Sequence, residues 1–313
     1  MSQKQHWAQI GETTFIFGIW LLYWVHKLLG RWPFLICLYP VVFSHWLLRP
    51  ALRAASLQYL RRVQAATGAI GHEPGWRDSL RHIARFAETV LDKLLAVSGR
   101  YPFHQVNTEG REAFYANAET GRGGVIVTAH IGCLELCRAM AEQRAAVKLN
   151  ILVHTRHAEA FNRLLKRLNP NNDLQLIEVT DMSPATALLL SDKVANGEFV
   201  VIAGDRVPVT ASKTVSINFL GHDALLPIGP YVLASLLKCP LHLLGCIHEK
   251  DGYTVHFQRL AEHVELPRNN RQQALTAHAQ TYANALTELL KRSPYDWFNF
   301  FPFWDQNDDD TRH

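Results

Sequence analysis

From about residue 105 onward, short apolar segments alternate with segments of helical periodicity, and this alternation limits the folds that the chain can adopt. The strand-like segments read GVIVTAH, KLNILVH, LQLIEV, EFVVIAGD, HLLGCIHE and YTVHFQRL. Helical segments are expected at roughly 133–145, 157–168, 184–196, 229–238 and 271–292. This order predicts an α/β fold with a mixed, largely buried sheet flanked by helices, because strands that alternate with helices form a sheet that the helices cover.

The beginning of the chain has a different composition. Residues 13–48 form two apolar runs, which are separated by His26, Lys27 and Arg31, and Pro40 interrupts the second run. Neither run reaches the roughly 18 uninterrupted apolar residues that a spanning helix requires. We therefore expect an apolar N-terminal membrane-associated helical segment attached to one face of the membrane, with a single span as the alternative. Two ordinary core helices, apolar all round, are a third reading.

A basic cluster follows the apolar segment and consists of Arg49, Arg53, Arg61 and Arg62. An anionic cytoplasmic leaflet would attract these side chains, each contributing on the order of 1 kcal/mol. The cluster predicts that the rest of the chain lies on the cytoplasmic side. Residues 77–97 carry apolar side chains at helical spacing, which predicts an amphipathic helix.

Charge and cysteine content argue against several classes of protein. The formal net charge of +4 is only mildly basic, so the chain falls short of the charge typical of nucleic-acid-binding proteins. The five cysteines include no CxxC pair, which argues against a disulfide framework and a zinc site. A reducing compartment fits this cysteine usage better than an oxidising one.

His130 stands at the end of the strand-like segment, and Glu135 follows it by five positions. Folds of this class place their chemistry at the carboxyl ends of strands. On one helix this spacing would put the two side chains on different faces, but Gly132 provides a bend before the helix that begins near Cys133. Glu135 can then hold one imidazole nitrogen of His130 and leave the other as a base. A satisfied histidine at a strand end is the alternative reading.

The signature motifs of several hydrolases and nucleotide-binding proteins are absent from the sequence. It contains no HExxH, GxSxG or GxxxxGK[ST], and the glycines of TGRGG precede the strand instead of following it. A base without a protein nucleophile most naturally deprotonates a hydroxyl or an amine of a substrate. That hydroxyl or amine would then attack an acyl group that is already activated.

The strand followed by TAHIGCLE resembles the first block, H-x4-D/E, of bacterial lysophospholipid-type acyltransferases, and specifically of the lipid A late acyltransferase branch. The resemblance extends to GETTFIFGIWLLYWVHKLLGR, HTRHAEAFNRLLKRL, GEFVVIAGDRVPV, FLGHDALLPIGPYVLASLLKCPL and YDWFNFFPFW. In that family the histidine is the general base and the acidic residue orients it. The resemblance therefore implies these roles for His130 and Glu135.

Two further blocks imply substrate-binding residues. The segment EFVVIAGDR ends in Asp205 and Arg206, a second charged strand end that could lie beside the first, although such a dipeptide usually forms a surface ion pair. The resembling family commonly has Asp-Gln at this place, so Arg206 departs from its pattern. Arg156, at the end of the strand NILVHTR, could bind phosphate or the phosphopantetheine of a carrier.

The block FLGHDALLPIGPYVLA resembles a glycine- and proline-shaped loop that leads into an apolar helix. Phe219, Gly221, Pro227 and Gly229 would then line the entrance for the acyl chain, and a structural turn is the alternative. Lipid A enzymes of this branch usually close on a basic stretch, whereas this chain ends in WFNFFPFWDQNDDD. That ending looks more like acyltransferases that accompany fatty-acid-type synthesis clusters, such as those for aryl polyene lipids. Its aromatic residues could also cap the core or touch the membrane interface.

The motifs and the resemblance imply a membrane-associated acyltransferase, with 1–60 as an apolar and basic membrane-association segment and 61–313 as the acyltransferase domain. It would move an acyl chain from an acyl carrier protein or coenzyme A thioester to a hydroxyl or amine of a lipid-like acceptor, at the cytoplasmic face of the bacterial inner membrane. Backbone N–H groups near Gly132 or Arg206 would stabilise the oxyanion. We expect no metal, no cofactor beyond the donor and no nucleic-acid partner. A lipid thioesterase or lipase, or a noncatalytic lipid-binding scaffold protein, is the alternative.

Overall fold

The computed structural model describes residues 23–110, 112, 121–137, 148–153, 175–178, 183–207, 213–250 and 252–308. Its elements with defined bounds are, in chain order, α2 (Arg31–Leu48), α3 (Pro50–Thr67), α4 (Trp76–Val97), the 3₁₀ helix η2 (Phe103–Gln105), β1 (Val106–Glu109), β2 (Gly124–Thr128), β3 (Leu149–Val153), β4 (Gln175–Glu178), α8 (Pro184–Ala195), β5 (Phe199–Ala203), β6 (Thr214–Phe219), β7 (His222–Pro227), α9 (Gly229–Leu236), β8 (Leu241–Glu249), β9 (Gly252–Ala261), α10 (Arg271–Arg292) and the 3₁₀ helix η4 (Phe303–Asp308). Residues 23–29 are also helical.

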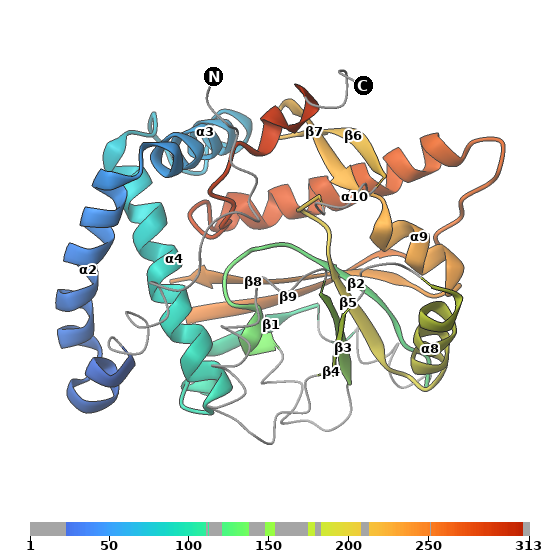
Figure 1. Ribbon diagram of the computed structural model, residues 1–313, viewed down its shortest axis with the longest axis horizontal. Coiled ribbons are helices and arrows are strands. Elements are labelled where there is room, and N and C mark those ends of the chain that lie inside the picture. The colour runs from blue at the N-terminus through green and yellow to red at the C-terminus, as the bar shows by residue number, and fades with distance from the viewer. Residues whose placement is uncertain are drawn as a thin grey trace.

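Seven strands form the main sheet, in the order β1-β9-β8-β2-β5-β3-β4. The pair β8 and β9 is antiparallel, and the other neighbouring pairs are parallel. Figure 1 shows α10 running along one side of this sheet, with α4 and α2 at one end of the molecule. The sheet is therefore mixed, as the sequence predicts. Each of the six apolar segments expected to be strands supplies one of its strands, and β1 is the seventh.

β2 lies at the centre of the sheet, and all five of its residues are buried. Its side chains enter two separate cores at alternate positions. Val125 and Val127 belong to the core formed with α9 and α10, whereas Ile126 belongs to the core formed with α4. A strand covered on both faces has to be apolar throughout, which explains why GVIVT shows no polar alternation.

Four of the described helices match helical segments expected from the sequence. α4, α8, α9 and α10 lie within two residues of the expected bounds. Of the helix expected at 133–145, residues 134–137 are helical and the remainder lies outside the described residues. The helix expected at 157–168 lies outside them entirely.

α2 packs against α4 and buries Phe34, Leu38 and Val42. Pro40 does not break this helix, contrary to what the sequence suggests. A proline removes the donor for the carbonyl four residues earlier, here that of Ile36. Both Pro40 and Ile36 are exposed, so the carbonyl left without its helical partner lies on the outer side of the helix.

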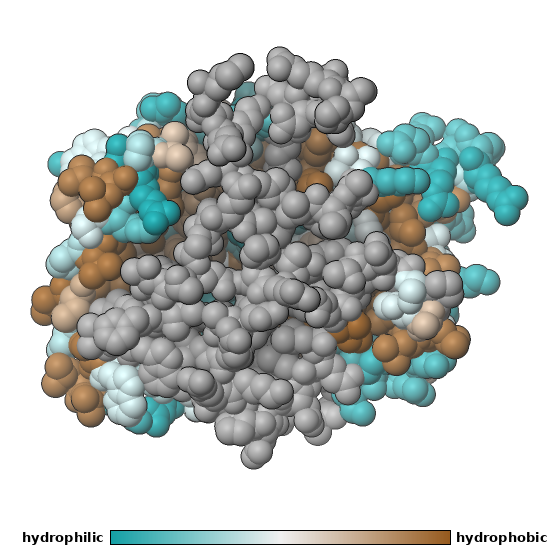
Figure 2. All heavy atoms as spheres, viewed as in Figure 1, coloured by the Kyte–Doolittle hydropathy of each residue, from teal (hydrophilic) through white to brown (hydrophobic). Residues whose placement is uncertain are grey.

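The outer side of α2 is apolar and exposed. Trp32 is 80% exposed and Ile36 is 70% exposed. Figure 2 shows hydrophobic side chains along the edge of the molecule where α2 lies in Figure 1. Among the described residues, no single helix is both long and apolar enough to cross a membrane, but α2 and α3 pass this test as a pair that is bent by 96°.

β6 and β7 form a separate antiparallel hairpin, which the sequence analysis did not anticipate as strands. Leu220 and Gly221 make the turn, and both have positive φ angles, of 53° and 80°. Two such residues between paired strands match the twist of a hairpin. The segment read as a shaped loop is therefore mostly regular structure, followed directly by α9.

Candidate active site

Two polar strand ends meet at the carboxyl edge of the sheet. β2 and β5 are neighbouring parallel strands, and Thr128 pairs with Ala203 in their register. His130 and Asp205 each lie two residues beyond this pair, so the backbone brings them to the same place. The expectation that the second charged strand end lies beside the first is met.

Asp205 contacts His130 twice. Its Oδ1 lies 2.8 Å from the ring nitrogen Nδ1, and its Oδ2 accepts a hydrogen bond of 2.9 Å from the backbone amide of His130. An ionised carboxylate can only accept, so Nδ1 carries the hydrogen and Nε2 keeps its lone pair. The His130 side chain is 36% exposed, which leaves the ring open to approach.

Two more side chains fix Asp205 from the C-terminal part of the chain. Trp297 Nε1 and Asn299 Nδ2 each donate to its Oδ2 at 2.9 Å. Burial alone would raise the pKa of Asp205, but the attraction to the His130 ring in its protonated form, the hydrogen bonds from His130 and the charge of Arg206 together bring this pKa well below its usual range. Asp205 is therefore ionised at neutral pH.

The electrostatic surroundings of His130 favour its neutral form. Burial and the positive charge of Arg206 lower the pKa of His130, and the nearby charge of Asp205 only partly opposes them. The ring is therefore uncharged at neutral pH. A general base requires this form, because it has to accept a proton from the substrate.

Glu135 makes a different contact from the one that the sequence suggests. Its Oε1 lies 3.3 Å from Nζ of Lys93 on α4. Within the described parts of the chain, Glu135 forms no ion pair with His130, and its Oε2 is buried without a hydrogen-bond partner. The carboxylate on the imidazole is that of Asp205, which the sequence analysis assigned to substrate binding. The orienting role of Glu135 stays a prediction that no contact in this structure supports.

The turn after His130 is tight. Gly132 has a φ of 50°, and a Cβ atom there would overlap the carbonyl oxygen of Cys246. The amide of Gly132 donates to the carbonyl of Asp296 at 2.9 Å, and the amide of Cys133 donates to the carbonyl of Cys246 at 3.1 Å. Both amides are therefore engaged in this conformation, which disagrees with the expectation that N–H groups near Gly132 stabilise an oxyanion.

Arg206 binds the C-terminal part of the chain. Its Nε donates to Asn299 Oδ1 at 2.7 Å, and its Nη2 donates to the carbonyl of Phe298 at 3.1 Å. Burial lowers the pKa of Arg206 to about 10, with Asp205 opposing the shift, so the guanidinium remains charged at neutral pH. Arg206 thus helps to hold the residues that hold Asp205.

The remaining residues predicted to bind substrate lie further from this pair. Gly221 is in the turn of the β6–β7 hairpin, while Pro227 ends β7 and Gly229 begins α9. The hairpin reaches the site through Phe219, whose ring packs at 5.5 Å from that of Trp297. Arg156 lies outside the described residues.

Trp297 and Asn299 are site residues that were not predicted from the sequence. Trp297 is fully buried and forms an isolated bridge with Ile131, so this stretch runs beside the turn after His130. In extended backbone, residues two positions apart face the same side. The order Trp-Phe-Asn within YDWFNFFPFW is the signal that could have placed Trp297 and Asn299 together. The buried aromatic rings cap the core, which favours that alternative over contact with a membrane.

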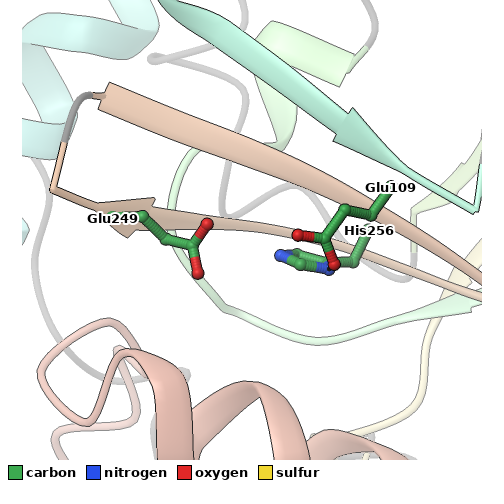
Figure 3. A group of neighbouring side chains, drawn as sticks. All are labelled: Glu109, Glu249 and His256. Atoms are coloured by element: carbon green, nitrogen blue, oxygen red, sulfur yellow. Dashed lines mark ion pairs between the residues drawn. The ribbon is translucent and has the colours of Figure 1, made fainter.

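A group of potential metal ligands lies elsewhere, at Glu109, Glu249 and His256. Figure 3 shows the two carboxylates pointing toward the imidazole from different strands. Arg292 already donates to both carboxylates, with hydrogen bonds of 2.7 and 2.8 Å to Glu109 and 2.8 Å to Glu249. The guanidinium of Arg292 supplies the positive charge that a metal would bring. We therefore interpret the group as an ion-pair network that joins α10 to β1 and β8.

Comparison with models of protein families matches residues 92–306 to the bacterial lipid A biosynthesis acyltransferases. The matched region includes His130, Asp205 and the C-terminal residues that fix them. A search of curated proteins found no match to the chain. Since the family model covers more than half of the sequence, the chain belongs to the bacterial lipid A biosynthesis acyltransferase family.

Proposed function

We propose that this acyltransferase moves an acyl chain from a thioester donor to a hydroxyl or amine of a lipid-like acceptor, with His130 as general base. The observation that carries the proposal is the double contact between His130 and a buried, ionised Asp205. This contact fixes the tautomer and leaves Nε2 as the proton acceptor on a partly exposed ring. We assign to Asp205 the orienting role that the sequence analysis gave to Glu135.

The reaction needs no covalent intermediate on the protein. As the acceptor oxygen or nitrogen attacks the thioester carbonyl, its proton passes to Nε2 of His130, and Asp205 stabilises the imidazolium that forms. The tetrahedral intermediate then collapses, the carbon–sulfur bond breaks, and the imidazolium returns the proton to the thiolate. Arg206 lies close enough to lower the pKa of His130, and its charge would also favour the oxyanion.

We propose that the donor is an acylated carrier protein, with acyl-coenzyme A as the other thioester to test. Exposed arginines are present on α3 and at the start of α4, among them Arg61, Arg77 and Arg81. An acidic carrier protein would be attracted to such a surface. The same charges would favour an anionic lipid surface, so the donor has to be decided by assay.

The membrane association that we propose uses α2. Its outer side exposes Trp32 and Ile36, and Leu48 at its end is 77% exposed. Apolar side chains of this kind stabilise attachment to one leaflet by burial between lipid chains. Attachment at the cytoplasmic face of the bacterial inner membrane would bring the site to a lipid-like acceptor and to a cytosolic carrier protein.

The test is an acyl-transfer assay with the purified full-length protein in mixed detergent micelles. It compares acyl carrier protein and coenzyme A donors, with and without a lipid alcohol or amine, and identifies products by mass spectrometry. We expect acylated acceptor with wild-type protein and little with His130→Ala. Hydrolysis of the thioester at full rate without acceptor would favour a thioesterase instead. Equal product formation by wild type and His130→Ala would rule out the proposed base.

A further inference from the structure

A second histidine–aspartate pair lies near the first and repeats its geometry. His248 is the penultimate residue of β8, and its Nδ1 lies 2.9 Å from Asp296 Oδ1. Its backbone amide donates to Asp296 Oδ2 at 2.5 Å. Asp296 thus contacts ring and amide of one histidine, as Asp205 contacts those of His130.

The two pairs are joined through residues 296–299. Asp296 at one end accepts the bonds from His248 and, through its carbonyl, the bond from Gly132. Trp297 and Asn299 donate to Asp205, and the amide of Phe298 donates to the carbonyl of His130 at 2.8 Å. A displacement of Asp296 would therefore be transmitted to the residues that fix both Asp205 and His130.

His248 cannot itself meet a substrate in this structure. Its side chain is only 11% exposed, and the ring of Tyr253 lies over it at 3.9 Å between centroids. Its second nitrogen, Nε2, points to Asp92 on α4 at 3.8 Å. The partly exposed ring of His130 is therefore the candidate base, and His248 has to act through other residues.

We propose that His248 is a positioning residue, which anchors Asp296 and so keeps residues 296–299 in the place from which they hold the Asp205–His130 pair. An effect of this role on turnover rests on the proposed function. The coupling between the His248–Asp296 pair and the His130–Asp205 pair can be measured without turnover. Asp296 is fully buried, so removing its histidine partner leaves a buried charge with weaker compensation.

The charges around His248 support this anchor. Burial lowers the pKa of His248, but Asp296 and Asp92 outweigh burial and the opposing charge of Arg85, so the net shift is upward. Arg85 Nε lies 4.0 Å from Asp296 Oδ1, and the Tyr253 hydroxyl donates to Asp92 at 3.1 Å. The two buried carboxylates thus stabilise the protonated ring relative to a free histidine, and this is the form that binds Asp296 most strongly.

Three variants separate the two sides of the His248 ring. His248→Asn keeps a donor where Nδ1 meets Asp296, His248→Gln places its amide nearer to Asp92, and His248→Leu keeps neither bond. The exposed His263 provides the matched control, His263→Asn. We expect His248→Leu and His248→Gln to lower kcat by about tenfold to a hundredfold with little change in KM, since misplaced catalytic groups cost on this scale. His248→Asn should restore most of the loss.

The readout that does not depend on activity is the reactivity of His130 toward diethyl pyrocarbonate, which modifies the neutral imidazole. Trypsin cleavage after Arg122 and Arg138 yields a peptide whose only histidine is His130, so mass spectrometry can follow this residue alone. Asp205 raises the pKa of His130, whereas Arg206 and Lys93 lower it. If Asp205 is displaced, the pH midpoint of His130 modification should move to lower pH in His248→Leu and His248→Gln.

The outcomes are distinct. A shifted midpoint in His248→Leu and His248→Gln, but not in His248→Asn or His263→Asn, supports the positioning role even if no acyl transfer is found. An unchanged pH midpoint of His130 modification in all variants overturns the positioning role. This holds even if turnover falls in the variants by the same factor at every pH. If His248→Leu does not fold, the Asn and Gln variants decide, and equal midpoints in these two would overturn the proposal. Absence of turnover in the wild type would instead contradict the proposed function.

Discussion

Asp205 binds both the ring and the backbone amide of His130, at 2.8 and 2.9 Å, although the two residues lie 75 positions apart in the sequence. The backbone contact fixes where the carboxylate lies, and the ring contact fixes which nitrogen carries the hydrogen. Because Trp297 and Asn299 also donate to the same carboxylate, its orientation does not depend on the imidazole alone. The pair is therefore organised before any substrate binds.

The first prediction separates the two carboxylates that could orient His130. Asp205→Asn should lower kcat by about 10² to 10⁴, because an amide no longer stabilises the imidazolium and can favour the wrong tautomer. Glu135→Gln should cost less, since Glu135 contacts Lys93 and not the ring. The measurement is kcat with one donor and one acceptor for both variants and for His130→Ala. Equal losses in Asp205→Asn and Glu135→Gln, with both variants folded, would return the orienting role to Glu135.

The sequence indicated the histidine and a second polar strand end that could lie beside it, but not that Asp205 would bind the imidazole ring. Strand identity follows from local apolar runs, so β2 and β5 were predicted correctly. Which strands become neighbours, and in what register, depends on packing between distant segments. The pairing of Thr128 with Ala203 brings His130 to Asp205, and no local spacing contains this information. The H-x4-E spacing and the family resemblance indicate Glu135 instead, because both are read from the local sequence.

The second prediction concerns the turn at Gly132. A side chain there would combine a left-handed backbone conformation with overlap on the carbonyl of Cys246. Gly132→Ala should therefore destabilise the fold by well over the roughly 1–2 kcal/mol that the backbone conformation alone costs. Gly221→Ala is the matched control, because Gly221 has a similar φ but nothing within 4 Å of an added Cβ. Thermal unfolding of both variants checks this, and equal effects would contradict the predicted overlap.

The third prediction is a dependence of stability on acid pH that involves His82. This ring is fully buried between Ser56 and the carbonyl of Trp297, at 3.0 and 2.9 Å. Burial lowers its pKa to about 4, against the opposing effects of Trp297 and Asp296. Between the unfolded value of 6.5 and this folded value, the unfolded chain binds the proton that the folded chain does not. The free energy of unfolding should therefore fall as the pH is lowered across this interval.

His82→Gln tests this contribution, because glutamine can still donate to the Trp297 carbonyl but does not titrate. The difference in unfolding free energy between wild type and variant should change by on the order of 1.4 kcal/mol per pH unit within the interval, and level off above pH 6.5. Denaturant unfolding at several pH values measures it. Parallel curves for the two proteins would show that His82 does not titrate on unfolding. Other buried histidines, such as His242, cancel in this comparison.

The fourth prediction tests attachment through the outer side of α2. Trp32→Ser and Ile36→Ser should each weaken binding to vesicles by about 1.5–3 kcal/mol if these side chains enter the lipid. Neither side chain is buried within the protein, so the fold should not be affected. Deletion of residues 1–48 would be less specific, since Phe34 and Leu38 pack against α4. Vesicle sedimentation at low and high salt separates the apolar contribution from the electrostatic one.

Leu188→Ser provides the control for that experiment, because Leu188 is 65% exposed but lies on α8. Binding that is unchanged in the α2 variants, or reduced equally in Leu188→Ser, would contradict attachment through α2. The sequence predicted apolar helices in this region from composition. It could not distinguish the buried Phe34 from the exposed Trp32, because both belong to one continuous apolar run, and only packing against α4 separates the two sides.

The C-terminal residues bear on the choice of acceptor because they pack close to the site. The ring of Trp304 lies 5.9 Å from that of Trp297, which donates to Asp205. Asp305 follows directly and is exposed. Asp309 and Asp310 lie outside the described residues. Gln58 Nε2 donates to Asp305 Oδ1 at 3.5 Å, and Arg62 lies close enough for the two charges to interact. The negative charge of Asp305 nevertheless disfavours an acceptor that carries two phosphates, since like charges repel.

The last prediction is that the purified enzyme acylates a neutral or singly charged lipid-like alcohol or amine in preference to a bisphosphorylated lipid A precursor. The measurement is a competition in mixed detergent micelles with one acyl-carrier donor and both acceptors, followed by mass spectrometry of the products. Asp305→Asn should shift the product ratio toward the bisphosphorylated acceptor, because it removes one negative charge while keeping a side chain of similar size. Dominant labelling of the lipid A precursor by the wild type would overturn this choice of acceptor and would leave the chemistry of His130 and Asp205 unaffected.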